Sequence, residues 1–334
     1  MATGRARDLT APAAVPVVPL RHPGRWVAAA VVVVLAVMLA HSLFFSHVVV
    51  NGRIRERFEW NVINQYFLSS EILKALGITI ALTVVAMAGG ITIGVVLAIM
   101  RLSPNPIVTG SAWLYIWFFR GTPVLVQLLF WYNASYIFPS FSLGLPFGPA
   151  LVHFNLNTWL TPFLVASVGP ALNEGAYMSE VVRAGLISVD EGQTEAAQSI
   201  GMSHFLTLRL IVIPQAMRVI IPPTGNETIS MLKTTSLASV VTVSELTFTV
   251  SQIMAANYKT VPLFMVAGLQ YLWVTSVLMV GQYYVERHYA KGSVRQLPPT
   301  PLQRLRRGLL IRPGRTGYGR FGEVYGAPFV KELP

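Results

Sequence analysis

The chain has 334 residues, of which 53% are hydrophobic and only 12% are charged, against about 25% charged residues in an ordinary soluble domain. This composition is typical of an integral membrane protein and nearly excludes a soluble enzyme. Because the chain has no cysteine, disulfides, thiolate catalysis and cysteine-ligated metals are excluded as well.

The net charge of +11 is concentrated in the two tails of the chain. Residues 1–26 carry a net charge of +3 and residues 288–334 a net charge of +7. Lys and Arg near the ends of membrane spans favour the cytoplasmic side, so we expect both tails in the cytoplasm. Residues 288–334 are also rich in Pro and Gly, and we expect them to be disordered. Their basic charge would attract anionic lipid, whereas nucleic acid is not an expected partner.

Six segments are apolar over about the 20 residues that a spanning helix needs. They predict an all-α integral membrane protein with about six transmembrane helices, at about residues 27–45, 73–100, 122–138, 159–183, 215–239 and 261–284. The first span, within residues 27–47, is expected to remain uncleaved. In the second, Gly90 and Gly94 have a spacing that lets another helix approach closely. Residues 48–71 and 139–158 are expected as outer loops, and the aromatic residues of 113–119 at headgroup level.

The sequence contains no catalytic constellation and no metal-ligand cluster. There is no G-x-x-x-x-G-K-[ST], G-x-S-x-G or H-E-x-x-H pattern. If the protein moves a solute against a gradient, the energy must come from an ion gradient or from another polypeptide.

A polar segment, residues 184–210, separates the fourth and fifth spans. Ser188 and Glu191 have the spacing of a capping box, which predicts a short helix that ends at Gly201. Ser203 is expected to start a second short helix, and Pro214 to mark the entry into the fifth span. The pair is either a docking surface for another protein or an ordinary loop.

Four motifs in order carry a resemblance to a known family. They are FFRGTPVLVQ (118–127), EGAYMSEVVRAG (174–185), EAAQSIGM (195–202) and NETISMLKTTSLASVVTVSEL (226–246). Together they resemble the bacterial ABC-importer permeases for polar amino acids of the histidine, glutamine and arginine type, with their EAA motif. The similarity covers about residues 72–287. It implies a five-span permease core, to which the N-terminal span is an addition.

The resemblance also implies how the protein is energised. In this family the EAA helix, here near residues 188–201, is the coupling helix, and Glu195, Ala196, Ala197 and Gly201 are assigned to contact with a separate ATP-binding subunit. ATP and Mg would be held by that subunit, and this chain would need no cofactor and would be no enzyme. Further implied partners are a second permease chain, identical or similar, an extracytoplasmic solute-binding protein and membrane lipid. The implied location is the bacterial cell (inner) membrane. The alternative function is an ion-gradient-driven secondary transporter of small polar solutes, although no inverted repeat is visible.

Ionisable residues within spans are costly and usually face a bundle interior or a cavity. Glu180 and Arg183 are three residues apart and are expected to pair. Glu174 must be protonated or compensated by a cation, either a cationic group of the substrate or a salt bridge with Arg218 or Lys233. Residues assigned to the substrate path are Glu174, Tyr177, Gln127 and Asn226, and residues assigned a structural or gating role are Glu180, Arg183, Glu227 and Lys233.

Overall fold

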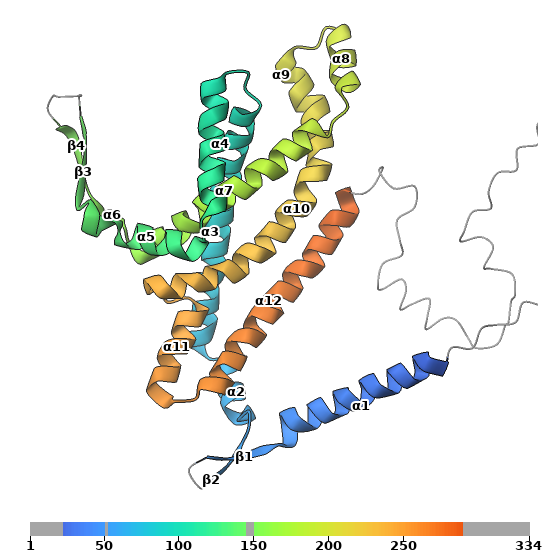
Figure 1. The fold of residues 1–334 in the computed structure, drawn as a ribbon, viewed down its shortest axis with the longest axis vertical. Helices are drawn as coiled ribbons and strands as arrows, with labels where there is room; N and C mark the ends of the chain where they lie inside the picture. The colour runs from blue at the N-terminus through green and yellow to red at the C-terminus, as the bar shows by residue number, and fades with distance from the viewer. Residues whose placement is uncertain (1–22, 51–52, 145–149, 290–334) are drawn as a thin grey trace, which may run out of the picture. The chain divides into compact units, whose positions relative to one another are not determined.

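The computed structural model describes residues 23–50, 53–144 and 150–289. Most of the two basic tails, residues 1–22 and 290–334, lies outside these ranges. The expected disorder of the C-terminal tail therefore concerns residues outside the described part of the chain. The described chain divides into two compact units, residues up to 76 with 246–270, and residues 77–245 with those from 271 onward. Most of the described residues are helical (Figure 1).

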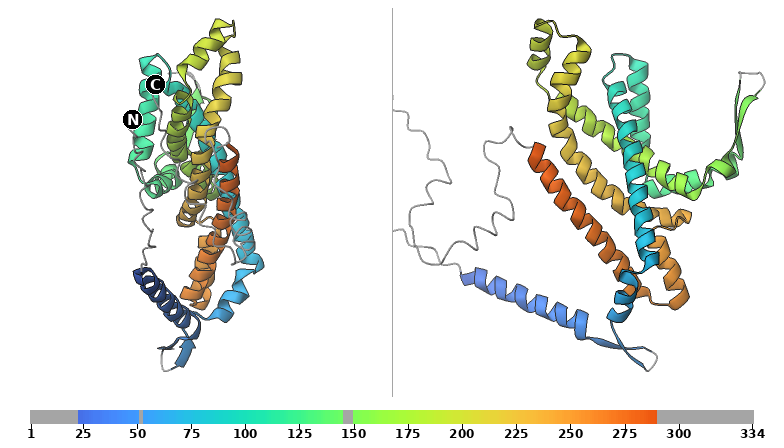
Figure 2. Two further views of the ribbon diagram at one scale, coloured as in Figure 1. Left: turned by 90° about the vertical axis from the view of Figure 1, so that its right-hand side faces the viewer. Right: turned by 180° about the vertical axis from the view of Figure 1, so that it is seen from behind.

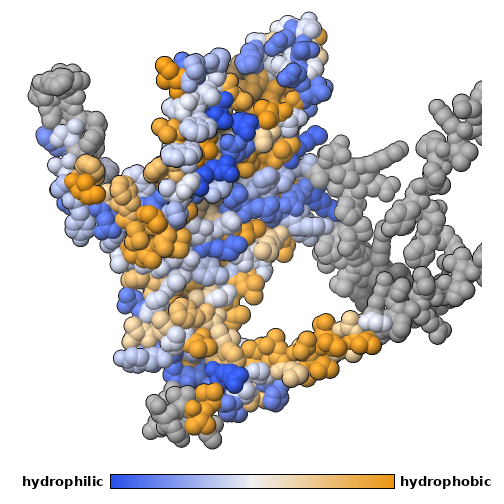
Figure 3. Space-filling model, viewed as in Figure 1, coloured by the Kyte–Doolittle hydropathy of each residue, from blue (hydrophilic) through white to orange (hydrophobic). Residues whose placement is uncertain are grey.

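The first unit begins with helix α1 (Pro23–Phe45), a hairpin of strands β1 (His47–Val50) and β2 (Arg53–Glu56), and helix α2 (Trp60–Phe67). Its later part holds α11 (Leu246–Asn257) and the start of α12 (Thr260–Tyr289). The indole of Trp60 donates to the carbonyl of Leu43 at 3.0 Å and ties α2 to the end of α1. Figure 3 shows α1 as a nearly continuous hydrophobic rod, as expected for a helix whose side chains face lipid.

The second unit is built around helix α7 (Pro162–Ile187), which packs on α4 (Pro106–Gly121), α5 (Val124–Ile137) and α10 (Ile213–Thr234). It also holds most of α3 (Ser70–Arg101) and of α12. The remaining elements of this unit are β3 (Ser140–Gly144), β4 (Ala150–Asn155), α6 (Leu156–Trp159), α8 (Glu191–Ser199), α9 (His204–Thr207), the π-helix η1 (Leu208–Val212) and the 3₁₀-helix η2 (Thr235–Val241).

The close approach expected at Gly90 and Gly94 is confirmed. A Cβ placed on Gly90 would lie 2.6 Å from Cγ of Glu174, and one on Gly94 would lie 2.5 Å from Cβ of Met178. Both contacts join α3 to α7. The absence of side chains at these two positions therefore sets how closely the central helix packs.

The count of six spans is not confirmed. Four helical segments are long and apolar enough to cross a membrane in the described part of the chain, namely 26–45, 70–101, 204–241 and 260–289. A fifth span requires α4 and α5 to be counted together, although they meet at an angle of 104°. Helix α7 is 26 residues long but is not among these segments, because polar residues such as Asn173, Glu174, Glu180 and Arg183 lower its hydropathy.

Two further expectations are corrected by the structure. The expected third span, 122–138, is the 14-residue helix α5, too short to cross a bilayer alone, and the aromatic residues before it lie on a separate helix, α4. The two expected outer loops are partly regular, since each contains a two-stranded antiparallel hairpin. The second short helix expected from Ser203 is confirmed as α9, whose N-cap is Ser203, and it continues through η1 into α10, which begins at Ile213 beside Pro214.

Candidate functional site

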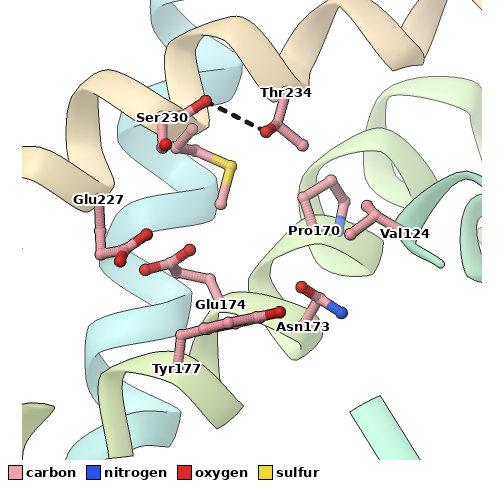
Figure 4. A pocket seen from close by; sticks show the side chains of 9 residues that line it. Val124, Pro170, Asn173, Glu174, Tyr177, Glu227, Ser230 and Thr234 are labelled. Atoms are coloured by element: carbon pink, nitrogen blue, oxygen red, sulfur yellow. Dashed lines mark hydrogen bonds between the residues drawn. The ribbon is translucent and has the colours of Figure 1, made fainter. Parts of the chain in front are cut away.

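The central cavity of the second unit has a volume of about 280 Å³ and lies among α5, α7 and α10. Figure 4 shows the side chains that line it. These residues are Val124, Pro170, Asn173, Glu174, Tyr177, Glu227, Ser230, Met231 and Thr234. Two of them, Glu174 and Glu227, are carboxylates, and they come from two different helices.

Helix α7 places Glu174 against the cavity wall by close packing. The residue before Glu174 is Asn173, whose amide donates to the carbonyl of Phe119 at 2.7 Å and thereby fixes α7 to the end of α4. On the opposite side, Gly90 of α3 leaves the space that the methylene groups of Glu174 fill. The side chain of Glu174 is 6% exposed, so its position is determined by neighbours on both sides.

The two carboxylates face one another, as Figure 4 shows. Oxygen Oε1 of Glu174 is buried and has no hydrogen-bond partner. Within the described ranges neither Glu174 nor Glu227 takes part in an ion pair. Two carboxylates that face one another without a cationic partner repel each other, and a cation bound between them would relieve this repulsion.

The salt bridge that was one of the two explanations of Glu174 is absent from the described structure. Its first possible partner, Arg218, does not line the cavity, and its second, Lys233, lines a different one of about 490 Å³ between α10 and α12. Asn226, predicted for the substrate path, also faces that second cavity. Only Glu174 and Tyr177 of the four predicted path residues line the central cavity.

Gln127, the remaining predicted path residue, has a structural position. Its side chain is 5% exposed, and its amide nitrogen donates to the carbonyls of Phe119 and Thr122 at 3.0 and 3.1 Å and to the hydroxyl of Thr122 at 2.6 Å. These acceptors lie at the bend between α4 and α5. Gln127 therefore stabilises the bend instead of facing the cavity.

The expected pairing of Glu180 with Arg183 is confirmed. The Nη2 of Arg183 lies 2.6 Å from Oε2 of Glu180, one turn earlier on α7. Both side chains are about one third exposed, so the pair is worth little stability.

The comparisons with known proteins agree with this architecture. Residues 90–291, more than half of the chain, match the family described as binding-protein-dependent transport system inner membrane component. The chain belongs to this family of transport permeases.

Individual relatives of the permease extend the match over most of its length. It is 45% identical over 289 residues to the arginine transport system permease protein ArgU of Corynebacterium glutamicum, covering 86% of this chain and 87% of the relative. It is 38% identical over 223 residues to the nopaline transport system permease protein NocM of Agrobacterium fabrum, covering 65% and 89%. A crystal structure of an amino acid ABC transporter with histidines matches with a TM-score of 0.57 and 31% identity, covering 69% of this chain and 98% of that one.

Membership of the family decides between the two functions that the sequence left open. The permease is the membrane-spanning subunit of an ABC transporter and is not an enzyme, so the ion-gradient-driven alternative is not supported. It is a multi-pass membrane protein that works with an ATP-binding subunit and a substrate-binding partner. Among the described residues, no three His, Asp or Glu side chains are grouped so that they could hold a metal ion.

The permease carries its EAA motif on α8, which with α9 projects beyond the ends of α7 and α10 (Figures 1 and 2). The helix ends in a Schellman motif, with Gly201 at φ +84° and the amide of Met202 donating to the carbonyl of Ala197 at 3.1 Å. The end predicted at Gly201 is therefore confirmed.

The predicted start of α8 is wrong by two residues. Its N-cap is Asp190, which accepts from the amide of Gly192 at 2.8 Å. Ser188 instead caps the end of α7, and its hydroxyl donates to the carbonyl of Gly185 at 2.7 Å. Both residues are good caps, and the end of α7 at Ile187 decides which of them can start the next helix.

The side chains exposed around α8 are not the same as the residues that the EAA motif assigns to the contact. Glu195 and Ala196 are exposed, but Ala197 is 5% exposed because α8 packs on α9 and η1. Two large apolar side chains that were not assigned to the contact from the sequence, Ile200 and Phe205, are 79% and 70% exposed. Their apolar character beside polar neighbours is the signal that would have identified them.

Proposed function

We propose that this permease imports cationic polar amino acids in an ATP-driven ABC transporter. The observation that carries the proposal is the cavity in which Glu174 and Glu227 face one another without a cationic partner among the described residues. A guanidinium or ammonium group of a substrate would supply the missing charge. The 45% identity to a permease named for arginine transport supports the same class of substrate.

The cavity volume supports a small substrate. The volume of about 280 Å³ lies just below the usual range of about 300–1,000 Å³ for small-molecule sites. Polar groups of Tyr177, Ser230 and Thr234 line it beside the carboxylates, and the apolar stem of a basic side chain could pack on Val124 and Met231. A neutral polar amino acid would leave both carboxylates uncompensated, which is why the proposal specifies a cation.

Transport is driven, in this proposal, from the cytoplasmic ends of the helices. The segment around α8 docks on an ATP-binding subunit, which holds ATP and Mg, through Glu195, Ala196, Ile200 and Phe205. The π-helix between α9 and α10 makes the docking segment continuous with the helix that carries Glu227. Closure of the ATP-binding subunits would therefore act on one wall of the substrate cavity.

The remaining parts of the assembly follow from the family. Two permease chains, either identical or similar, are expected to form the membrane portion, with both tails of each chain in the cytoplasm. A solute-binding protein is expected to deliver the amino acid from the outer side of the bacterial cell membrane.

The test is ATP-dependent uptake into proteoliposomes that contain the permease, its ATP-binding subunit and its solute-binding protein. Radiolabelled L-arginine, L-glutamine and L-glutamate are compared at equal concentrations. We expect L-arginine to be taken up at least tenfold faster than the other two, and L-lysine to compete with it. Preferred uptake of L-glutamate would refute a site built on two carboxylates.

A further inference from the structure

A second polar cavity, of about 440 Å³, lies on the other side of Tyr177, between the end of α3, α4 and α7. Its lining includes Arg101, Arg120, Tyr177 and Glu180, together with the exposed indoles of Trp113 and Trp117. The charge of this cavity is opposite to that of the acidic cavity around Glu174. Nothing in the transport scheme above uses it.

The carboxylate in this second cavity, that of Glu180, already has a cationic partner. Glu180 forms the ion pair with Arg183 at 2.6 Å, so it does not compensate the other two guanidinium groups. In the described part of the chain, neither Arg101 nor Arg120 takes part in an ion pair. The cavity therefore holds two cations without a counter-ion.

Both guanidinium groups are placed to receive an acceptor. The Nε of Arg101 is buried and has no hydrogen-bond partner, which is a costly state for a charged donor. The Cζ of Arg120 lies 5.1 Å from the centroid of the Tyr177 ring, which orients the planar group. A planar guanidinium binds a carboxylate with two parallel hydrogen bonds, so a carboxylate is the anion that this geometry fits well.

Tyr177 lines both cavities, so the two cavities adjoin one another at its side chain. Glu174, Tyr177 and Glu180 follow one another at intervals of three residues, which places them along one side of α7. With a rise of 1.5 Å per residue, each step is about 4.5 Å along the helix axis. The residues of α7 that line the acidic and the basic cavity thus follow one another at about one-turn intervals, a spacing comparable to the length of one amino acid.

We propose that Arg120, with Arg101 behind it, binds the α-carboxylate of the transported amino acid while the cationic end of the same molecule lies between Glu174 and Glu227. The proposal rests on the function proposed above and specifies its substrate class as α-amino acids with both a free carboxylate and a cationic side chain. Arg120 is then a specificity-determining residue that discriminates against amines and amides lacking the carboxylate. Tyr177 holds Arg120 in place through its ring.

The test measures binding to the purified complex of full-length permease and ATP-binding subunit in lipid nanodiscs, without the solute-binding protein. The probes are L-arginine and L-argininamide, which differ only in the carboxylate. We expect wild type to bind L-arginine at least tenfold more tightly than L-argininamide. In Arg120→Gln the affinity for L-arginine should fall to that for L-argininamide, whose own affinity should change less than twofold.

The controls separate this inference from the proposed function. Arg218→Gln removes a guanidinium that lines neither cavity and should keep the tenfold ratio. Glu174→Gln should weaken both probes and also keep the ratio. If Arg120→Gln does not yield folded complex, Arg120→Lys retains the charge but loses the two-donor fork, and the ratio should fall by at least threefold.

Several results would overturn the proposal. An unchanged ratio of the affinities for L-arginine and L-argininamide in a folded Arg120 variant would show that another group binds the carboxylate. The proposed function would then remain intact. An equal loss of both probes that depends on the anionic lipid content of the nanodisc would identify a lipid phosphate as the ligand of Arg120. Failure of wild type to bind L-arginine would overturn the proposed function and this inference together.

Discussion

Gly90 and Glu174 lie so close that a side chain on Gly90 would displace the side chain of Glu174. A Cβ on Gly90 would be 2.6 Å from Cγ and 2.7 Å from Cβ of Glu174. The glycine of α3 therefore supports the acidic cavity from outside, because it leaves room for the Glu174 side chain of α7. The spacing of Gly90 and Gly94 in the sequence predicted a helix contact, and the structure places this contact beside Glu174.

Replacing Gly90 by alanine should force α3 and α7 apart or rotate Glu174. Overpacking of this kind costs about 1–3 kcal/mol, so we expect a lower melting temperature of the detergent-solubilised complex and reduced L-arginine uptake per folded complex. Gly77→Ala in the same helix is the matched control, because a Cβ there meets nothing within 4 Å. Equal stability and equal uptake of both variants would contradict the close contact.

Several helices and one helix end could be predicted from the sequence alone. The apolar runs around residues 27–45, 73–100 and 261–284 predicted α1, α3 and α12 to within a few residues, since each run alone satisfies the length of a span. Gly201 was predictable as a helix end because the left-handed conformation is nearly specific to glycine.

Other features depend on contacts between distant segments. The spacing of Glu174 and Glu227 along the chain gives no sign that both reach one cavity. Likewise, the 104° bend between α4 and α5 rests on the hydrogen bonds of Gln127 with Phe119 and Thr122, which a pattern of apolar residues does not reveal. The short helix α11 lay between two segments with clear patterns and was not predicted.

Gln127 should affect stability and not selectivity. Gln127→Leu removes the amide that donates to the Phe119 and Thr122 carbonyls, and loss of a buried donor costs about 1–3 kcal/mol. We expect a lower yield and melting temperature but an unchanged ratio of L-arginine to L-glutamine uptake. Asn133→Leu on the same helix, whose amide bonds an exposed carbonyl, should leave the stability of the complex nearly unchanged. A changed ratio of L-arginine to L-glutamine uptake in Gln127→Leu would instead show that Gln127 contributes to the substrate path.

Gly201 should be required for coupling. Gly201→Val forces a β-branched residue into φ +84° at a cost of about 1–2 kcal/mol and should misdirect the chain after α8. Membrane insertion and yield should survive, because a Cβ at this position meets nothing within 4 Å. Substrate-stimulated ATP hydrolysis and uptake should fall together, and Gly201→Asn should restore part of both, since Asn tolerates this conformation. Normal stimulated hydrolysis in Gly201→Val would argue against the docking assignment.

Both tails should be cytoplasmic, because residues 1–26 carry a net charge of +3 and residues 288–334 a net charge of +7. The absence of native cysteine allows single cysteines at Arg5 and Arg315 to be labelled without background. Neither should react with a membrane-impermeant thiol reagent in intact cells, and both should react after the cells are permeabilised. Labelling of either tail in intact cells would show that the number of crossings, or their orientation, differs from the expectation.

Glu174→Gln should change selectivity more than stability. Because no described cation pairs with Glu174, neutralising it leaves no stranded charge, so the yield and basal ATP hydrolysis of the complex should be retained. A substrate cation would lose its most buried counter-charge, and we expect the apparent affinity for L-arginine to fall at least tenfold, equivalent to about 1.4 kcal/mol. Affinity for L-glutamine should change little. Glu71→Gln, at the exposed first turn of α3, is the control and should behave as wild type. A reduced yield with unchanged selectivity would instead mean that Glu174 has a cationic partner within the assembled permease, and the acidic cavity would then be structural.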